Sequence, residues 1–223
     1  MGGPVKRRYD NSRRQAQARD TRFRILEAAN ALFTEHGYPA TTLEAIADAA
    51  DTSLPTLYRL FSSKRALLKG VLDISFGGDD QSIAFGDRPE VQAALARTDP
   101  EALIRAFARI GRDFMQRSSA IMHVLATAAQ VDADAAQLME EIRRQRYTGQ
   151  SRIVATLSAR GALDPSLEYS EAVDATYLAL SPDAHRILTV ECGWTANQYE
   201  RWLVRTLRML LRPKPPATTG ASQ

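Results

Sequence analysis

The sequence lacks the residues on which several classes of protein depend. Its single cysteine, Cys192, permits neither an internal disulfide nor a cluster of thiolates for zinc. The three histidines, His36, His123 and His185, show no spacing typical of metal ligands. No apolar run of about 18 residues is present, and the N-terminus lacks the apolar run of a signal peptide. We therefore expect a soluble, cytoplasmic protein that has no membrane segment, no metal and no cofactor.

Composition and missing motifs exclude further classes. Twelve glycines and ten prolines among 223 residues are too few for a fibrous or wholly disordered chain, and 44% hydrophobic residues suffice for a core. No GxSxG, Walker, Rossmann or HExxH pattern occurs, so we predict that the protein is not an enzyme. The basic run 143–146 is more typical of a solvated helix face than of a phosphate site.

Positive charge is concentrated in residues 1–24. This segment has eight Lys or Arg against two acidic residues, a net charge of +6, whereas the remainder has 21 basic against 24 acidic residues, a net charge of −3. Such a segment suits a polyanion such as nucleic acid. A solvated, disordered tail is the alternative interpretation.

Apolar residues recur at helical spacing through most of the chain. The first stripe begins at Ile25 and ends before Gly37, which we expect to cap the helix with left-handed backbone. Further stripes follow over residues 43–72 and 103–211, and strand-like alternation is not sustained anywhere. The sequence therefore predicts an all-α fold. The tail 213–223, rich in proline and threonine, is typical of a disordered segment.

Residues 42–61 predict two short helices joined by a three-residue turn. Thr41 or Thr42 can cap the first helix, and Ser53 can cap the second, with Pro55 in its first turn. The turn needs a residue that tolerates positive φ, and Asp51 is among the few non-glycine types that do. The arrangement is typical of a helix-turn-helix, with an ordinary helical hairpin as the alternative.

The outer side of the second short helix distinguishes these interpretations. It is polar at Ser53, Thr56 and Arg59, with Tyr58 and Lys64 nearby. A hairpin inside a bundle explains the apolar spacing but gives no reason for this polar side. The pattern therefore favours DNA binding.

Residues 21–68 resemble the N-terminal domain of TetR-type one-component transcriptional regulators. The matching residues are Phe33, Gly37, Tyr38, Thr42, Ile46, Ala47, Ala50, Ser53, Thr56, Leu57, Tyr58, Phe61, Lys64 and Leu67. The family usually has glycine where Asp51 stands and an aliphatic residue where Thr52 stands. These two differences affect the turn and leave the rest of the resemblance intact.

The resemblance implies a homodimer that binds a palindromic operator in double-stranded DNA. Each recognition helix, at about residues 53–60, would enter a major groove. Leu54 and Pro55 would contact thymine methyl groups and read groove shape, and Arg59 would contact a guanine or a phosphate. Phosphates would be held by Thr42, Tyr58 and Lys64. The predicted DNA-binding residues are Thr42, Ser53, Leu54, Pro55, Thr56, Tyr58, Arg59 and Lys64.

The resemblance also assigns the dimer and a small-molecule pocket to the second half of the chain. The last two helices, expected at about 168–191 and 195–212, would pair with their copies, with Tyr177, Trp202, Thr206 and Met209 as interface candidates. A small, mainly apolar effector is expected to release the repressor from DNA. Candidate effector-binding residues are Phe107, Ile110, Phe114, Met122, His123 and Tyr147. Core packing is the alternative for each of these residues.

The predicted organisation has four parts. Residues 1–19 form a basic, flexible arm that would follow the DNA backbone or enter the minor groove. Residues 20–66 form a three-helix DNA-binding domain, and residues 67–212 form a larger helical domain for effector and dimer. Residues 213–223 form a disordered tail. Two alternatives stay open: a DNA-binding dimer with no small-molecule effector, and a helical adaptor that does not bind DNA.

Overall fold

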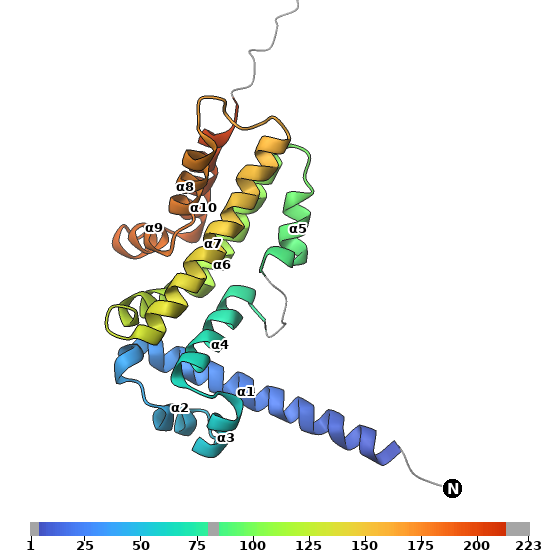
Figure 1. Ribbon diagram of the computed structural model, residues 1–223, viewed down its shortest axis with the longest axis vertical. Coiled ribbons are helices and arrows are strands. Elements are labelled where there is room, and N and C mark those ends of the chain that lie inside the picture. Colours follow the sequence, from blue (N-terminus) through green and yellow to red (C-terminus); the bar gives the residue numbers. More distant parts are fainter. Residues whose placement is uncertain (1–4, 80–84, 213–223) are drawn as a thin grey trace, which may run out of the picture. The chain divides into compact units, whose positions relative to one another are not determined.

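The computed structural model describes residues 5–79 and 85–212, with side chains described from residue 13 onward. Within these residues every regular element is a helix, which confirms the predicted all-α fold (Figure 1). The predicted disordered tail lies outside the described residues. In chain order the elements are α1 (Val5–Ala40), α2 (Leu43–Ala49), α3 (Leu54–Leu60), α4 (Lys64–Gly77), the 3-10 helix η1 (Phe85–Asp87), α5 (Pro89–Leu95), α6 (Pro100–Ala128), α7 (Ala133–Ala159), α8 (Tyr169–Ala179), α9 (Pro182–Arg186), the π-helix η2 (Ile187–Glu191), α10 (Ala196–Leu207) and the 3-10 helix η3 (Arg208–Leu210).

The described chain divides into two compact units. The first contains the residues before 84 together with residues 117–142, and the second contains residues from 84 to 116 together with those from 143 onward. The long helices α6 and α7 therefore each contribute to both units. None of the helices in residues 5–79 and 85–212 has the length and apolar composition that crossing a bilayer requires.

One apolar core holds the first unit together. Phe33 of α1, Ile46 of α2, Leu57 of α3 and Leu68 of α4 are fully buried in it, and α6 adds Leu125. Burying a large aliphatic or aromatic side chain contributes about 1.5–3 kcal/mol. Helices as short as α2 and α3 are not stable alone in water, so this shared core is what keeps them folded.

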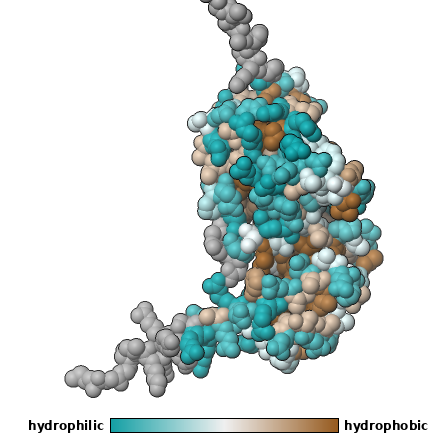
Figure 2. All heavy atoms as spheres, turned by 180° about the vertical axis from the view of Figure 1, so that it is seen from behind, coloured by the Kyte–Doolittle hydropathy of each residue, from teal (hydrophilic) through white to brown (hydrophobic). Residues whose placement is uncertain are grey.

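Helix α1 begins at Val5, well before the apolar stripe begins near residue 20. Residues 5–20 contain no glycine or proline and are rich in arginine, glutamine and alanine, which are good helix formers. Local propensity and continuity with the packed part of α1 explain this extension without an apolar face. Residues 5–19 of the predicted arm are thus helical. Figure 2 shows the described side chains at this end of α1 as a hydrophilic surface.

The backbone turns sharply at Gly37, near the end of α1. Gly37 has the expected positive φ of 78°, but its ψ of 162° is extended, so the predicted left-handed cap is wrong in this detail. Only glycine adopts this region readily because a Cβ atom would clash there. Directly afterwards, the ring of Tyr38 packs on Phe33 with centroids 5.5 Å apart. This turn returns the chain toward the core before α2 begins.

Side-chain caps fix the starts of the next three helices. Thr42, Ser53 and Ser63 accept hydrogen bonds from the backbone N–H groups three residues later, at 3.1, 3.3 and 3.0 Å. Of the two candidate caps before α2, Thr42 is therefore the cap. Thr41 is buried instead, with its hydroxyl near carbonyl oxygens of α1. Each cap satisfies an N–H group that the helix itself leaves unpaired.

The second unit ends in a series of shorter helices. Pro182 starts α9, so the expected helix 168–191 is divided into α8, α9 and η2. Thr195 and Gln198 cap the start of α10 reciprocally. Ion pairs join α6 to the C-terminal elements, including Arg208 to Glu101 at 2.8 Å.

The turn at Asp51 yields a test of the fold. Asp51 has φ 48° and is the one non-glycine residue with positive φ in the described chain. Asp51→Val should lower the free energy of unfolding by about 1–2 kcal/mol, because a β-branched side chain is strained there. Asp51→Asn should be close to neutral, because asparagine tolerates this region. Urea unfolding followed by circular dichroism would measure both, and equal stability of the two variants would contradict the assignment.

Candidate DNA-binding interface

The helices α2 and α3 form the predicted helix-turn-helix. Ile46 lies in the first helix and Ala50 directly follows that helix. Both residues pack in the same core as Leu57 of the second helix. Residues 50–53 connect the helices, and Thr52 donates its backbone N–H to the carbonyl oxygen of Ala47 at 3.0 Å. The core packing and this turn together fix how α3 is presented.

Arg24 of α1 binds the backbone of the turn between α2 and α3. Its Nη1 donates to the carbonyl oxygen of Ala50 at 2.8 Å and lies 3.5 Å from that of Asp51. Asp20, one helical turn earlier, lies 3.5 Å from the Arg24 Nε. A charged donor thus satisfies carbonyl groups that the end of α2 leaves unpaired. The role of Arg24 could not be predicted from the sequence, because no local spacing indicates a contact 26 residues away.

The side of α3 away from the core carries the predicted base-reading residues. Pro55 and Arg59 are exposed, and Tyr58 is half exposed at 50%. The hydroxyl groups of Ser53 and Thr56 form a hydrogen bond of 2.9 Å with each other. This bond uses one of the two hydroxyl hydrogens, so the other is free to donate outward. Arg59 has no hydrogen bond or ion pair to the described part of the chain. Leu54, on the same helix, is partly buried.

Thr42 and Lys64 lie at the starts of α2 and α4. The Thr42 oxygen accepts its cap bond, so its hydroxyl hydrogen stays available to a phosphate. The Lys64 Nζ lies 4.5 Å from the centre of the Tyr38 ring and 3.4 Å from the carbonyl oxygen of Pro39. Partial burial lowers the Lys64 pKa, and desolvation raises that of Tyr38 to about 12. Lys64 is therefore partly occupied by contacts within its own unit, and its phosphate contact stays a prediction.

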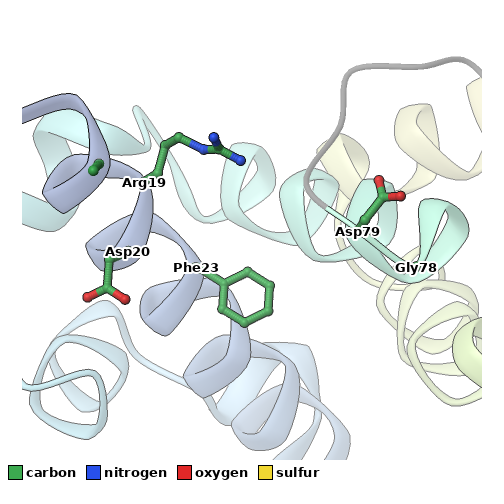
Figure 3. A pocket seen from close by; sticks show the side chains of 6 residues that line it. Arg19, Asp20, Phe23, Gly78 and Asp79 are labelled. Carbon is green, nitrogen blue, oxygen red and sulfur yellow. The ribbon is translucent and has the colours of Figure 1, made fainter. Parts of the chain in front are cut away.

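A shallow groove of about 490 Å³ lies elsewhere on the first unit, between α1 and the end of α4. Its lining includes Arg19, Asp20 and Phe23 of α1 and Gly78 and Asp79 after α4, with the Phe23 ring directed toward Gly78 (Figure 3). None of the predicted effector residues lines it, so it does not support the predicted effector site.

The predicted effector residues are divided between the units. Phe107, Ile110, Phe114 and Tyr147 belong to the second unit, and Met122 and His123 belong to the first. Phe107, Phe114 and Met122 are buried, whereas Tyr147 is 42% exposed and donates its hydroxyl to Asp174. His123 is exposed, so the alternative of a core histidine is wrong. Effector binding by these residues stays a prediction.

The predicted interface residues differ in exposure. Tyr177, Trp202 and Thr206 are partly buried within their own unit, and Met209 is 72% exposed. Two exposed apolar residues on neighbouring elements were missed by the sequence analysis, Leu178 at 69% and Val190 at 71%. Both follow the helical spacing of core residues, so only the three-dimensional structure identifies them as exposed.

The sequence of the first unit matches a known family. The family model described as "Bacterial regulatory proteins, tetR family" matches residues 25–71, which span α2, α3 and the packed parts of α1 and α4. Residues 25–71 are a TetR-family DNA-binding domain. The resemblance found over residues 21–68 is thereby confirmed.

Two curated proteins that are similar to this chain are transcriptional repressors. The transcriptional repressor KstR of Mycobacterium tuberculosis is 37% identical over 122 residues, which are 55% of this chain and 52% of KstR. The transcriptional repressor ComR of Escherichia coli is 36% identical over 74 residues, 32% of this chain and 35% of ComR. The matches thus span about half or less of these relatives.

Solved TetR-type structures share the fold over most of the chain. NalD, the secondary repressor of the MexAB-OprM multidrug efflux pump in Pseudomonas aeruginosa, superposes with a TM-score of 0.64 at 20% identity, covering 88% of this chain and all of NalD. SmeT in complex with triclosan superposes with a TM-score of 0.66 at 17% identity, covering 87% of this chain and 98% of SmeT.

The contact of Arg24 with the turn yields a second prediction. Arg24→Ala should lower the free energy of unfolding by about 1–3 kcal/mol, because a charged donor to the Ala50 carbonyl is lost. It should also weaken DNA binding, since α3 is then held less firmly. Arg201→Ala, an exposed change on α10, serves as the control. Unchanged unfolding and unchanged DNA affinity in Arg24→Ala would contradict this role.

Proposed function

We propose that the protein is a dimeric transcriptional repressor that binds a palindromic operator and leaves it when a small-molecule effector binds. The observation that carries this proposal is the exposed outer side of α3, where Arg59 and Pro55 project from a helix whose inner side is fixed in the core. A helix presented in this way suits the major groove of DNA. KstR and ComR, which are similar to part of this chain, are repressors.

Charge on α1 supports DNA as the partner. Residues 1–24 carry a net charge of +6, and the side chains of Arg13, Arg14, Arg19 and Arg22 are exposed on α1. Neutralising phosphates with such residues releases counterions and strengthens binding at low salt. We therefore propose that the N-terminal part of α1 contacts the DNA backbone.

Exposed apolar side chains of the second unit support a dimer. Leu178, Val190 and Met209 are each about 70% exposed and lie on α8, η2 and η3, which all contact α10. Apolar side chains of this size that gather on neighbouring elements mark an interaction surface. We propose that these residues, together with Tyr177, Trp202 and Thr206, pair with a second copy. Two copies would supply the two recognition helices that a palindrome requires.

The operator proposal is tested by selecting bound sequences from a random DNA pool at near-physiological salt. We expect a palindrome whose half-site centres lie about 34–36 Å apart or slightly more. Arg59→Ala should weaken binding to the selected sequence by about 1–3 kcal/mol, because Arg59 would lose a base or phosphate contact. Arg201→Ala on α10 is the matched control. If no sequence is enriched by the purified protein, the operator proposal fails and the helical adaptor becomes the better interpretation.

The dimer proposal is tested by placing a charge among the exposed apolar residues. Leu178→Arg should convert the dimer to a monomer, because a paired interface would bury an uncompensated charge. Val131→Arg changes a 77% exposed apolar residue of the first unit and should leave the dimer intact. Light scattering coupled to size-exclusion chromatography distinguishes the two. A Leu178→Arg protein that stays dimeric would overturn the proposed interface.

A further inference from the structure

Arg146 of α7 is a cation without a counter-ion in the second unit. Its Nη2 donates to the carbonyl oxygen of Leu180 at 3.0 Å and its Nη1 lies 3.4 Å from the Tyr177 hydroxyl, with the guanidinium 4.6 Å above the Tyr177 ring. No carboxylate of the described chain forms an ion pair with it, although Asp183 acts on it from farther away. The expectation of a solvated face at residues 143–146 is therefore wrong for Arg146. A partly buried charge of this kind is costly unless an anion compensates it.

Buried polar atoms without a hydrogen-bond partner occur on Arg146 itself and on two nearby side chains. The Arg146 Nε is buried and has no hydrogen-bond partner in the described chain, and the same holds for His185 Nδ1 and Tyr199 Oη. Tyr199 is completely buried and His185 is 7% exposed. Their rings meet edge to face with centroids 4.8 Å apart. Native proteins rarely leave several such groups together without a partner.

The chemistry of these atoms defines what could join them. Arg146 Nε and Tyr199 Oη can both donate a hydrogen bond, and His185 can donate through Nδ1 in one tautomer. Donors of this number around a cation suit a compact anionic acceptor such as a carboxylate. Aromatic rings flank the cluster, since Trp202 stacks on Tyr199 with centroids 5.8 Å apart and Tyr177 lies under Arg146. Tyr177 and Trp202 are partly exposed.

We propose that Arg146, His185 and Tyr199 form a binding site for the carboxylate group of a small aromatic molecule. This proposal rests on the proposed function only in that the second unit binds an effector. The effector would then be negatively charged, whereas the sequence predicted a mainly apolar one. Because Tyr177 and Trp202 also belong to the proposed dimer interface, a ligand here would act on the elements that pair two copies.

The site is tested by titrating the full-length protein with benzoate and with benzamide, its neutral counterpart. In a Trp194→Phe background Trp202 is the one remaining tryptophan, so its fluorescence reports on the ring that stacks on Tyr199. We expect saturable binding of benzoate and at least about tenfold weaker binding of benzamide, because the charged acceptor is lost. Tyr199→Phe should weaken benzoate binding about fivefold or more. Tyr169→Phe, which removes an exposed hydroxyl in the same unit, should leave it unchanged.

Thermal unfolding without ligand gives an independent reading of the same site. Tyr199→Phe should leave the melting temperature unchanged or raise it, because the hydroxyl has no partner to lose. A fall of several degrees would show that the hydroxyl is bonded to a structural water, and would overturn the proposal. Absence of benzoate binding, equal binding of benzamide, or full binding in Tyr199→Phe would also overturn it.

Operator binding is measured in the same samples to separate the two proposals. If benzoate binding requires Tyr199 but leaves the operator affinity unchanged, the carboxylate site is supported. The proposal that an effector releases the protein from DNA is then contradicted. If the operator is bound but benzoate is not, the repressor stands and the carboxylate site is overturned.

Discussion

The presentation of α3 depends on one constraint: two helices of seven residues each must be held by contacts that they cannot make alone. Isolated helices of this length do not persist in water, because the cost of starting a helix exceeds the gain of its few hydrogen bonds. Burial of Ile46 and Leu57 in the shared core compensates this cost. Arg24 then fixes the angle between the helices, since it binds the carbonyl groups at which α2 ends. The polar side of α3 stays exposed because the helix packs in the core through its opposite side, where Leu57 is fully buried.

Local chemistry was predictable from the sequence. The caps at Thr42, Ser53 and Ser63 and the positive φ of Asp51 follow from side-chain types at fixed offsets, so a single sequence indicates them. The helical state of residues 5–19 was not predicted, because an apolar stripe was the signal used and this segment has none. Propensity alone would have indicated it.

Contacts between distant parts of the chain were not predictable in this way. Nothing in the spacing around Arg24 or Arg146 distinguishes them from solvent-exposed arginines on a helix. The same limit explains Leu178 and Val190, whose helical spacing resembles that of core residues although both are exposed. The candidate DNA-binding side chains could be predicted because they carry a family pattern, whereas the candidate effector and dimer residues could be predicted only as members of helices.

The continuity of α7 gives the second unit a physical route to the DNA-binding helices. Arg146 follows Ile142, a core residue of the first unit, by one helical turn. Glu141, adjacent to Ile142, pairs with Arg65 at 3.0 Å, and Arg65 lies in the first turn of α4, which follows α3 directly. Partly exposed ion pairs of this kind contribute only about 0–1 kcal/mol, so small changes in α7 suffice to break the pair. In the proposed mechanism, a ligand that attracts Arg146 would act on the helix that also carries Glu141. Loss of the pair between Glu141 and Arg65 would then remove one restraint on the start of α4.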